Sequence, residues 1–333
     1  MNGERHLRAS LGGASDIALL TAIFAIVVWF WTLSQRSAAP DLPTSCLATT
    51  DLPLTPAGGM VRMDGGRFKM GSDDVRAEEA PSRETKVEPF WIDRHDVTNA
   101  QFGRFVRETG YVTLAERHSG AQPPASLVFR TPTSVKNLSD LGQWWTMIHG
   151  ADWRHPEGPG SSIAGRMHHP VVHVASADAA SYATWAGRQL PTEAQWEFAA
   201  RGGRDGDDFT WGNEPDNDAA PQANVWRGVF PVLNAGSNGF KGTSPVGCFP
   251  ANGYGLYDMV GNVWQWTRDA WTPDHATAPA SSTSRVIKGG SFLCATNFCL
   301  RYRPGARQPG DADTGASHIG FRTVLAVDGT KRN

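Results

Sequence analysis

No helical hydrophobic period is present in the sequence beyond Arg204, so the C-terminal part of the chain has to fold as short strands, turns and loops. The 333 residues include 36 glycines and 22 prolines, which disfavour long helices. The 13 tryptophans need packing surface and a partner for each indole N–H. The composition therefore predicts a rigid, loop-rich fold with little regular secondary structure.

Three helices are expected before that point. The first begins at the N-cap residue Thr98 and ends at Gly110, with apolar side chains at i, i+3 and i+4. The second is expected over residues 178–186. The third follows Thr192, which forms a capping box with Gln195, and it ends at a Gly-Gly pair.

Short strands are predicted around residues 60–71 and as one strand over 87–93, and the acidic segment 72–84 between them is expected to be mobile. No internal repeat of fixed period is visible, and no linker-like break follows residue 60. The sequence therefore predicts one compact α+β domain over residues 58–330.

The N-terminal segment predicts the compartment. Residues 17–33 are apolar and uncharged, which favours a transmembrane anchor after a short tail, 1–16. A linker rich in Pro, Ser, Thr and Ala follows over 34–57. The alternative is a signal peptide cleaved near 37–39, which would release a secreted protein. In both cases we expect the body to lie outside the cytosol.

Charge and cysteine content restrict the classes of function. A net charge of −2 gives no electrostatic case for a nucleic-acid partner. Four cysteines are too few for a disulfide framework, and spacing alone leaves open whether Cys46 and Cys248 are bonded to one another or free. Cys294 and Cys299 lie five positions apart behind a Gly-Gly turn, as a disulfide, a metal clamp or a redox centre would.

Several motifs together resemble the formylglycine-generating enzyme (sulfatase-modifying factor) family. They lie at residues 90–99, 153–159, 169–173, 188–203, 254–266, 289–291 and 317–322. The Gly-Leu-Tyr-Asp-Met-x-Gly-Asn-Val-Trp and Leu-Pro-Thr-Glu-Ala segments mark only the wider superfamily, which includes lectin-like binding modules. The Cys-x4-Cys pair between Gly-Gly-Ser and Arg-Tyr-Arg resembles the oxidases in particular.

This resemblance implies a compact C-type-lectin-like catalytic domain. Its activity would convert a cysteine in a Cys-x-Pro-x-Arg segment of an unfolded sulfatase into Cα-formylglycine, with O2, Cu(I) and a thiol reductant. By the same resemblance, Cys294 and Cys299 match the copper ligands, as suits a soft ion. Ser291 matches the active-site serine and Trp264 the wall of the oxygen pocket. His318 and Arg303 match positions at the substrate groove.

The resemblance also implies calcium sites. The first would use Asn224, the Val225 carbonyl, Asn238 and the Phe240 carbonyl; the second would use Asp258, the carbonyls of Gly261 and Val263, and Gln265; a further one matches Asp96. Asn238 stands where the family usually has Asp, and Gln265 where it usually has Glu. Calcium prefers carboxylate ligands, so both changes are expected to weaken binding.

Three further departures lie near the cysteines. Ala295 replaces a usual His, Phe298 a usual Tyr, and His318 a usual Asn. The changes at residues 238, 265, 295 and 298 favour a second hypothesis, a non-catalytic binding module on the same fold, whereas the presence of both cysteines favours the oxidase. A third hypothesis, a thiol–disulfide oxidoreductase, is disfavoured because the spacing lacks the Cys-x-x-Cys geometry at a helix start.

Overall fold

The computed structural model describes residue 46 and residues 57–118, 120, 122–278 and 282–327. These residues belong to one compact unit, which begins at residue 45. The predicted tail 1–16 and anchor 17–33, and nearly all of the linker 34–57, lie outside the described residues. Within the described ranges, we find no helix with the length and apolar character that a membrane crossing requires.

The three predicted helices are confirmed. Helix α2 spans Asn99–Thr109, between a capping box at Thr98 and a left-handed Gly110 with φ 68°. Helix α3 spans Ser176–Trp185 and α4 spans Glu193–Arg201. Across the described part of the chain no other α-helix is present, and the short 3₁₀ turns are η1 Ala77–Glu79, η2 Leu114–Glu116 and η3 Leu141–Gln143.

The strands are short and form several small sheets. They are β1 Met60–Met63, β2 Gly66–Met70, β3 Arg83–Val87, β4 Phe90–Asp93, β5 Ala125–Phe129, β6 Trp145–His149, β7 Gly228–Val229, β8 Leu233–Asn234, β9 Trp264–Ala270, β10 Ser284–Lys288, β11 Arg307–Asp311, β12 Ile319–Gly320 and β13 Val324–Ala326. The largest sheet has the order β11-β10-β9-β12, and a second has the order β1-β4-β13. Strands β2 and β3, β5 and β6, and β7 and β8 form two-stranded pairs.

Two expectations near the N-terminal strands are wrong. The stretch 87–93 is not one strand, because β3 ends at Val87 and β4 begins at Phe90. Pro89 lies between them and lacks the N–H that a continuous ladder needs. The segment 72–84 is not loosely held either, since Glu79 is fully buried and several of its neighbours bond to distant parts of the chain.

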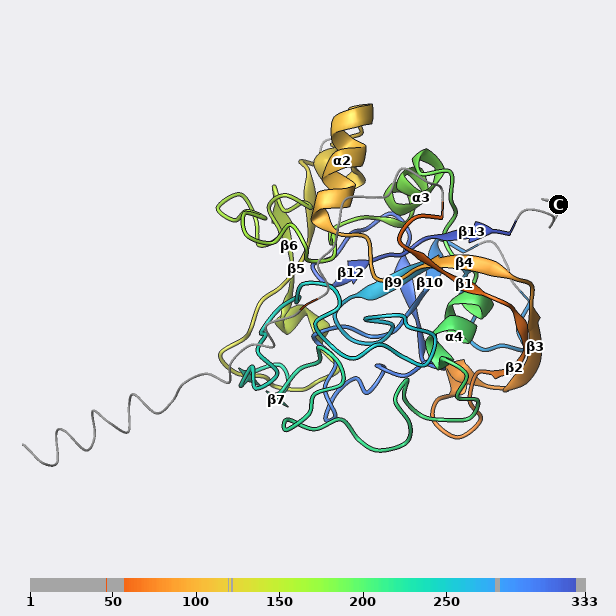
Figure 1. Ribbon diagram of the computed structural model, residues 1–333. Helices are drawn as coiled ribbons and strands as arrows, with labels where there is room; N and C mark the ends of the chain where they lie inside the picture. Colours follow the sequence, from red (N-terminus) through yellow and green to blue (C-terminus); the bar gives the residue numbers. More distant parts are fainter. Residues whose placement is uncertain (1–45, 47–56, 119, 121, 279–281, 328–333) are drawn as a thin grey trace, which may run out of the picture. The chain divides into compact units, whose positions relative to one another are not determined.

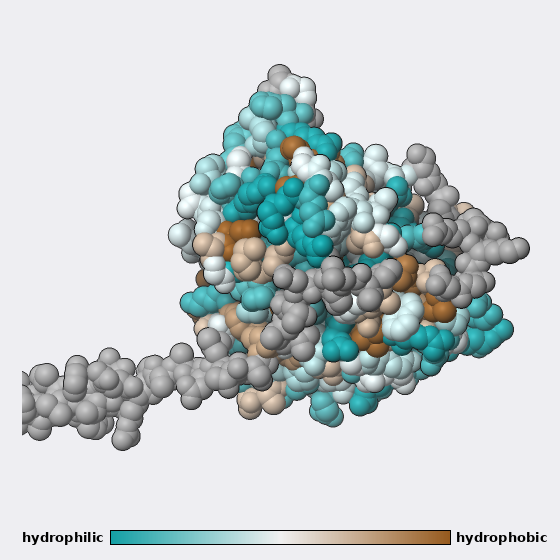
Figure 2. All heavy atoms as spheres, turned by 45° about the horizontal axis from the view of Figure 1, so that its top comes forward, coloured by the Kyte–Doolittle hydropathy of each residue, from teal (hydrophilic) through white to brown (hydrophobic). Residues whose placement is uncertain are grey.

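One main hydrophobic core lies between these elements. Helix α4 packs against β9, β10 and the β2–β3 pair, while α2 lies beside α3 on another side of the strands (Figure 1). Trp196 of α4 and Trp266 of β9 are both fully buried in this core. On the face drawn in Figure 2, hydrophobic residues form only small separate patches among hydrophilic ones. The fold is thus a mixed one with few helices, as the composition predicted.

Candidate active site

The loop after β10 brings two cysteines together. The Ala295 carbonyl accepts hydrogen bonds from the backbone amides of residues 298–300, at 3.2, 3.1 and 3.1 Å. These bonds curl the segment, and Cys294 and Cys299 are paired as a disulfide with their Cα atoms 4.8 Å apart. Both are buried, at 2% and 7% exposed. We call residues 294–303 the cysteine loop.

The residues before the cysteine loop hold its backbone in place. Gly290 has φ +71°, and a Cβ there would lie 3.0 Å from the backbone of Arg301, so a side chain would prevent this approach. Ser291 is fully buried. Its carbonyl accepts a hydrogen bond from the Cys294 amide at 2.9 Å, and its Oγ accepts one from the Leu293 amide at 3.3 Å. Ser291 is therefore bonded directly to the first cysteine.

Strands β9 and β12 place the next two predicted residues. They pair in parallel with Ile319 opposite Trp264, and the Trp264 amide donates to the His318 carbonyl at 2.9 Å. The His318 ring centroid lies 4.5 Å from that of Trp145. Burial, with a smaller contribution from His173, lowers the pKa of His318 to about 3. The His318 ring is therefore neutral at pH 7.

Three of the predicted catalytic residues belong to the main hydrophobic core, and the fourth, Ser291, is bonded to one of them. Cys294, Cys299 and Trp264 belong to the same core cluster. The Phe292 amide donates to the Asn262 carbonyl at 3.0 Å, which joins the segment that holds Ser291 to the one that leads into β9. The catalytic roles of these four residues stay predictions, but their placement is compatible with a single site.

A second hydrophobic cluster, which we call the aromatic cluster, covers one side of the cysteine loop. Its buried members are Trp144, Trp226, Phe230, Phe292, Leu293 and Ala295. Phe298 packs against it, with its ring stacked on Phe230 at 4.4 Å and edge-on to Trp144 at 5.7 Å. Ala295 is 1% exposed. A histidine at residue 295 would bury a polar imidazole among apolar side chains, which is unfavourable without a hydrogen-bond partner. An alanine at residue 295 and a phenylalanine at residue 298 therefore both suit this apolar cluster.

The sequence reasoning missed a segment that holds the cysteine loop from the other side. We call residues 72–82 the strap. Arg76 donates to the Cys299 carbonyl at 2.9 Å, Glu78 pairs with Arg301 at 2.8 Å, and Glu79 pairs with Arg303. The signal that could have found it is charge complementarity, since two acidic residues of the strap face two arginines two positions apart.

The strap determines where Arg303 points. Arg303 is 4% exposed, its guanidinium pairs with the fully buried Glu79, and its Nε donates to the Leu300 carbonyl at 3.1 Å. The side chain is thus engaged inside the protein. Its predicted contact with substrate stays a prediction, and the geometry gives Arg303 a role in holding the cysteine loop.

The first predicted calcium group is assembled, but amide hydrogens lie among its oxygens. The Asn238 Nδ2 donates to the Asn224 Oδ1 at 3.2 Å and to the Val225 carbonyl at 3.0 Å. The Asn238 Oδ1 accepts from the Phe240 amide at 3.2 Å. Both asparagines are buried, at 1% and 5% exposed. Donors therefore point at oxygens that a calcium ion would need.

The second predicted calcium group, around the 258–263 turn, is arranged in the same way. The Gln265 Nε2 donates to the Asp258 carbonyl at 2.8 Å. The Gln265 Oε1 already accepts from the Trp196 indole at 2.6 Å and from the Arg322 guanidinium at 2.7 Å. The turn contains Gly261, whose amide donates to the Gly289 carbonyl, and it ends at the buried Val263. Neither group fits calcium as its residues stand.

Asp96, the further calcium prediction, lies beside the second group. Its Oδ1 is 3.4 Å from the Arg322 guanidinium, and its buried Oδ2 has no hydrogen-bond partner among the described residues. Burial raises the pKa of Asp96 well above its ordinary value, despite Arg322. Burial also raises the pKa of Asp258 to about 6. Burial therefore makes ionisation of both carboxyls less favourable than in water.

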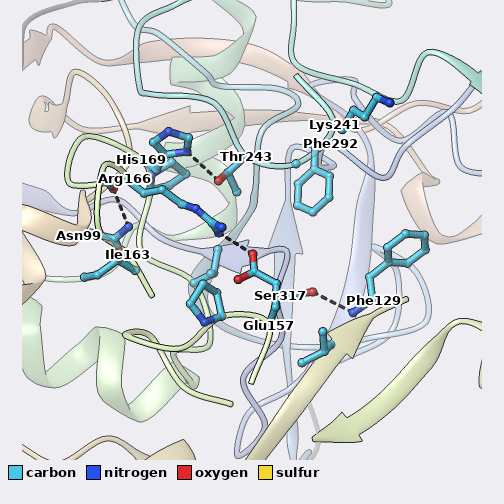
Figure 3. Close-up of a pocket in the computed structure, with 15 residues that line it drawn as sticks. Asn99, Phe129, Glu157, Ile163, Arg166, His169, Lys241, Thr243, Phe292 and Ser317 are labelled. Carbon is cyan, nitrogen blue, oxygen red and sulfur yellow. Dashed lines mark hydrogen bonds and ion pairs between the residues drawn. The ribbon is translucent and has the colours of Figure 1, made fainter. Parts of the chain in front are cut away.

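A cavity of about 440 Å³ opens next to the candidate site. Figure 3 shows Phe129 and Phe292 on one side of it, with Arg166, Glu157 and His169 on the other. Phe292 directly follows Ser291 in the chain, and Ser317, which also lines the cavity, directly precedes His318. The cavity therefore adjoins the residues that the sequence singled out.

The donor chemistry of the cysteine loop fits a soft monovalent metal. Two sulfur atoms are in contact there, and reduction of the pair would supply two thiolates. The described residues contain no group of three or more His, Cys, Asp or Glu side chains that could hold a metal ion. A two-thiolate set suits Cu(I) better than Zn²⁺, which takes four ligands in structural sites.

Comparisons with known proteins agree with this geometry. The family described as sulfatase-modifying factor enzyme 1-like domain matches residues 48–327. A formylglycine-generating enzyme of Mycobacterium tuberculosis is 48% identical over 290 residues, which are 80% of this chain and 97% of that protein. A mouse protein named inactive C-alpha-formylglycine-generating enzyme 2 is 39% identical over 316 residues, or 91% of this chain and 98% of that one.

A solved structure supports the fold. The structure of PvdO from Pseudomonas aeruginosa aligns with a TM-score of 0.60 at 23% identity, covering 85% of this chain and all of that one. A mixed fold with a paired-cysteine loop and the motifs above defines a protein of the sulfatase-modifying class. The chain belongs to the FGE-sulfatase family, as its sequence motifs predicted.

Proposed function

We propose that this protein matures sulfatases by converting a cysteine of the unfolded polypeptide into Cα-formylglycine. One observation carries the proposal: the chain holds two adjacent sulfurs in a buried loop fixed from both sides by the strap and the aromatic cluster. The names of relatives that are 48% and 47% identical over most of their length support the same activity.

We further propose that reduced Cys294 and Cys299 hold Cu(I). Bound there, copper would supply the activation of O2. The protein's own contribution is to keep both sulfurs close, through the Ala295 carbonyl, and to surround them with apolar side chains that exclude water. Ser291 and Trp264 would line the position of the substrate thiol.

The overall reaction balances with a thiol reductant as the second electron source. The substrate Cβ–S and one Cβ–H bond break, and a C=O bond forms. One oxygen atom of O2 enters the aldehyde and the other leaves as water, while the sulfur leaves as hydrogen sulfide. Two external thiols supply two electrons and become a disulfide.

The cavity beside Ser291 and His318 is the proposed entrance for the substrate chain. Its wall is apolar near Phe129 and Phe292 and polar near Glu157 and Arg166, as a site for an extended peptide needs. We propose that the Cys-x-Pro-x-Arg segment lies along this cavity.

We also propose that the domain works outside the cytosol. The Cys46–Cys248 pair, which the sequence left open, is a disulfide with Cα atoms 4.0 Å apart. Disulfides of this kind persist in oxidising compartments, which supports the proposed location. The membrane anchor at 17–33 stays a proposal.

The second candidate function is a non-catalytic module that binds the same polypeptides. Two relatives named inactive, 39% and 41% identical, favour keeping it, because overall identity does not separate them from the active ones. The buried Ala295 and the partly buried Phe298, where the family usually has His and Tyr, point the same way.

The test loads the reduced protein with one equivalent of Cu(I) and adds a Cys-x-Pro-x-Arg peptide, a thiol reductant and air. We expect a peptide aldehyde, detected by mass spectrometry and by capture with a hydroxylamine probe. A peptide with Ser in place of Cys is the control. If copper is bound and no aldehyde forms, the oxidase proposal fails, and peptide binding by the same sample would support the module.

We predict a positioning role for Arg76. Arg76→Met removes the hydrogen bond to the Cys299 carbonyl and a positive charge close to the sulfurs. Indirect support of metal ligands is worth roughly 10- to 100-fold in affinity or rate, so Cu(I) affinity is expected to fall by about 10-fold. Competition with a Cu(I) chelator measures this effect, and Arg76→Lys should restore part of it.

The control for Arg76 is Arg67→Met, which removes an exposed arginine of β2 that pairs with Glu84. It should leave copper affinity unchanged. An Arg76→Met protein with wild-type copper affinity and a lowered melting temperature would reduce the strap to a purely structural element.

A further inference from the structure

We propose that side-chain amides of this chain replace the two calcium ions that its family resemblance implies, so that the fold does not depend on calcium. In the first group, an amide NH2 donates to two oxygens that would have been calcium ligands. In the second, the amide oxygen that would have been a ligand already accepts two hydrogen bonds. The inference does not depend on the proposed enzymatic activity.

At the first group, the side-chain NH2 of Asn238 makes contacts that a calcium ion would make. Its two hydrogens are directed to the Asn224 Oδ1 and the Val225 carbonyl, and its own oxygen accepts from the Phe240 amide. In the opposite amide orientation, the Asn238 Oδ1 would face two acceptors and its Nδ2 would face the Phe240 amide, which is a donor. The network therefore fixes the orientation. With all three bonds made, Asn238 ties the segment after residue 236 to Asn224.

The other side-chain amide atoms near the first group are also hydrogen-bonded. The Asn224 Nδ2 donates to the Gly242 carbonyl at 2.9 Å and to the Asn262 Oδ1 at 3.3 Å. The Asn262 Oδ1 in turn accepts from the Ser244 amide at 3.0 Å. A buried network in which the three asparagine side-chain amides are satisfied holds irregular loops together without an ion.

At the second group, the Gln265 amide and the Arg322 guanidinium donate to the same carbonyl oxygen. The Gln265 Nε2 donates to the Asp258 carbonyl, and the Arg322 Nη2 donates to the same carbonyl at 3.1 Å. Arg322 is fully buried, so its charge acts in a medium of low dielectric. The Gln265 Oε1, which would be the calcium ligand, accepts from Trp196 and from Arg322, so an ion there would have to displace both donors and face the guanidinium.

Neutral amides also explain the charge balance. Calcium sites rely on carboxylates to offset the double charge of the ion. The first group contains none, and in the second Asp258 is the sole carboxyl, its Oδ2 already accepting from the Gly247 amide at 2.6 Å. Restoring a carboxylate at residue 238 or 265 should therefore create a calcium site where the present side chain removes one.

The test compares thermal unfolding of the wild type, Asn238→Asp and Gln265→Glu in EDTA and in CaCl2. The wild-type melting temperature should be the same in both, and equilibrium dialysis should find no bound calcium. Each variant should melt about 5 °C higher when calcium exceeds its Kd 100-fold than in EDTA. Asn217→Asp adds the same charge at an exposed turn and should show no calcium response.

Two outcomes would overturn the proposal. One is a wild-type protein that retains about one calcium per chain and loses stability in EDTA. The other is a pair of variants that bind no calcium although they remain folded. Where Asn238→Asp does not fold in EDTA, folding in CaCl2 alone supports the proposal. Asn238→Ala, which can restore neither the bonds nor a ligand, should be destabilised equally in both buffers.

Discussion

Formylglycine formation is expected to fall by more than about 100-fold when Cys299 is replaced by serine, because loss of a direct ligand exceeds the 10- to 100-fold cost of losing indirect support. Serine keeps nearly the same volume, but its hydroxyl is a poor ligand for a soft ion. The melting temperature should change little relative to the reduced wild type, since the backbone bonds to the Ala295 carbonyl remain. Aldehyde yield and bound copper are measured on the same sample.

The matched control removes the other cysteine pair. The double variant Cys46→Ser and Cys248→Ser eliminates a disulfide distant in sequence from the cysteine loop, so it should keep full copper loading and turnover even if it melts earlier. A Cys299→Ser protein that still makes the aldehyde at a tenth of the normal rate would contradict a two-thiolate site. Loss of activity in both variants would point to general instability.

Much of the fold could be predicted where the chain carries local signals. Thr98 with Gly110, and Thr192 with Gln195, are caps whose chemistry acts within one turn, so they set the limits of α2 and α4 directly. The prediction that no helix follows Arg204 is also confirmed across the described residues. These features need no knowledge of distant partners.

The remaining features depend on partners far apart in sequence. The strap was misjudged because Glu79 is acidic, and only its pairing with Arg303, 224 positions away, explains its burial. Asn238 and Gln265 likewise bond to partners elsewhere in the chain, at Asn224 and at Trp196 and Arg322. Motif matching singled out these residues, yet a motif specifies neither the direction of an amide nor which atoms face it.

The largest effect on stability is expected from Glu197, in the charge network beneath the candidate site. Glu197 and Lys288 are both fully buried, with the Lys288 Nζ 2.9 Å from the Glu197 Oε2. The Glu197 Oε1 accepts from Arg201 and from the Gly71 amide, each at 2.7 Å. Lys288 immediately precedes the Gly-Gly turn, so this pair supports the backbone that leads to Ser291.

Glu197→Gln is expected to destabilise the fold by about 3–5 kcal/mol, because it leaves buried positive charge without its main partner. At the size of this domain that corresponds to a fall of roughly 10 °C in melting temperature. Urea unfolding at pH 7 measures the free energy. Glu214→Gln, at an exposed position, is the control and should be neutral.

The same network predicts how stability depends on pH. Burial opposes ionisation of Glu193 and Glu197, but Lys288 and the neighbouring cations outweigh it, lowering the pKa of Glu197 and bringing that of Glu193 to about 2. Because these folded-state pKa values lie below the ordinary 4.5, the stabilisation is complete above about pH 4.5 and is lost as the pH falls toward 2. Glu197→Gln takes up one proton fewer on unfolding, so its unfolding free energy should fall less steeply between pH 5 and pH 3. An unchanged slope would mean that folding does not shift the pKa of Glu197, which would contradict the stabilisation of its carboxylate by Lys288 and Arg201.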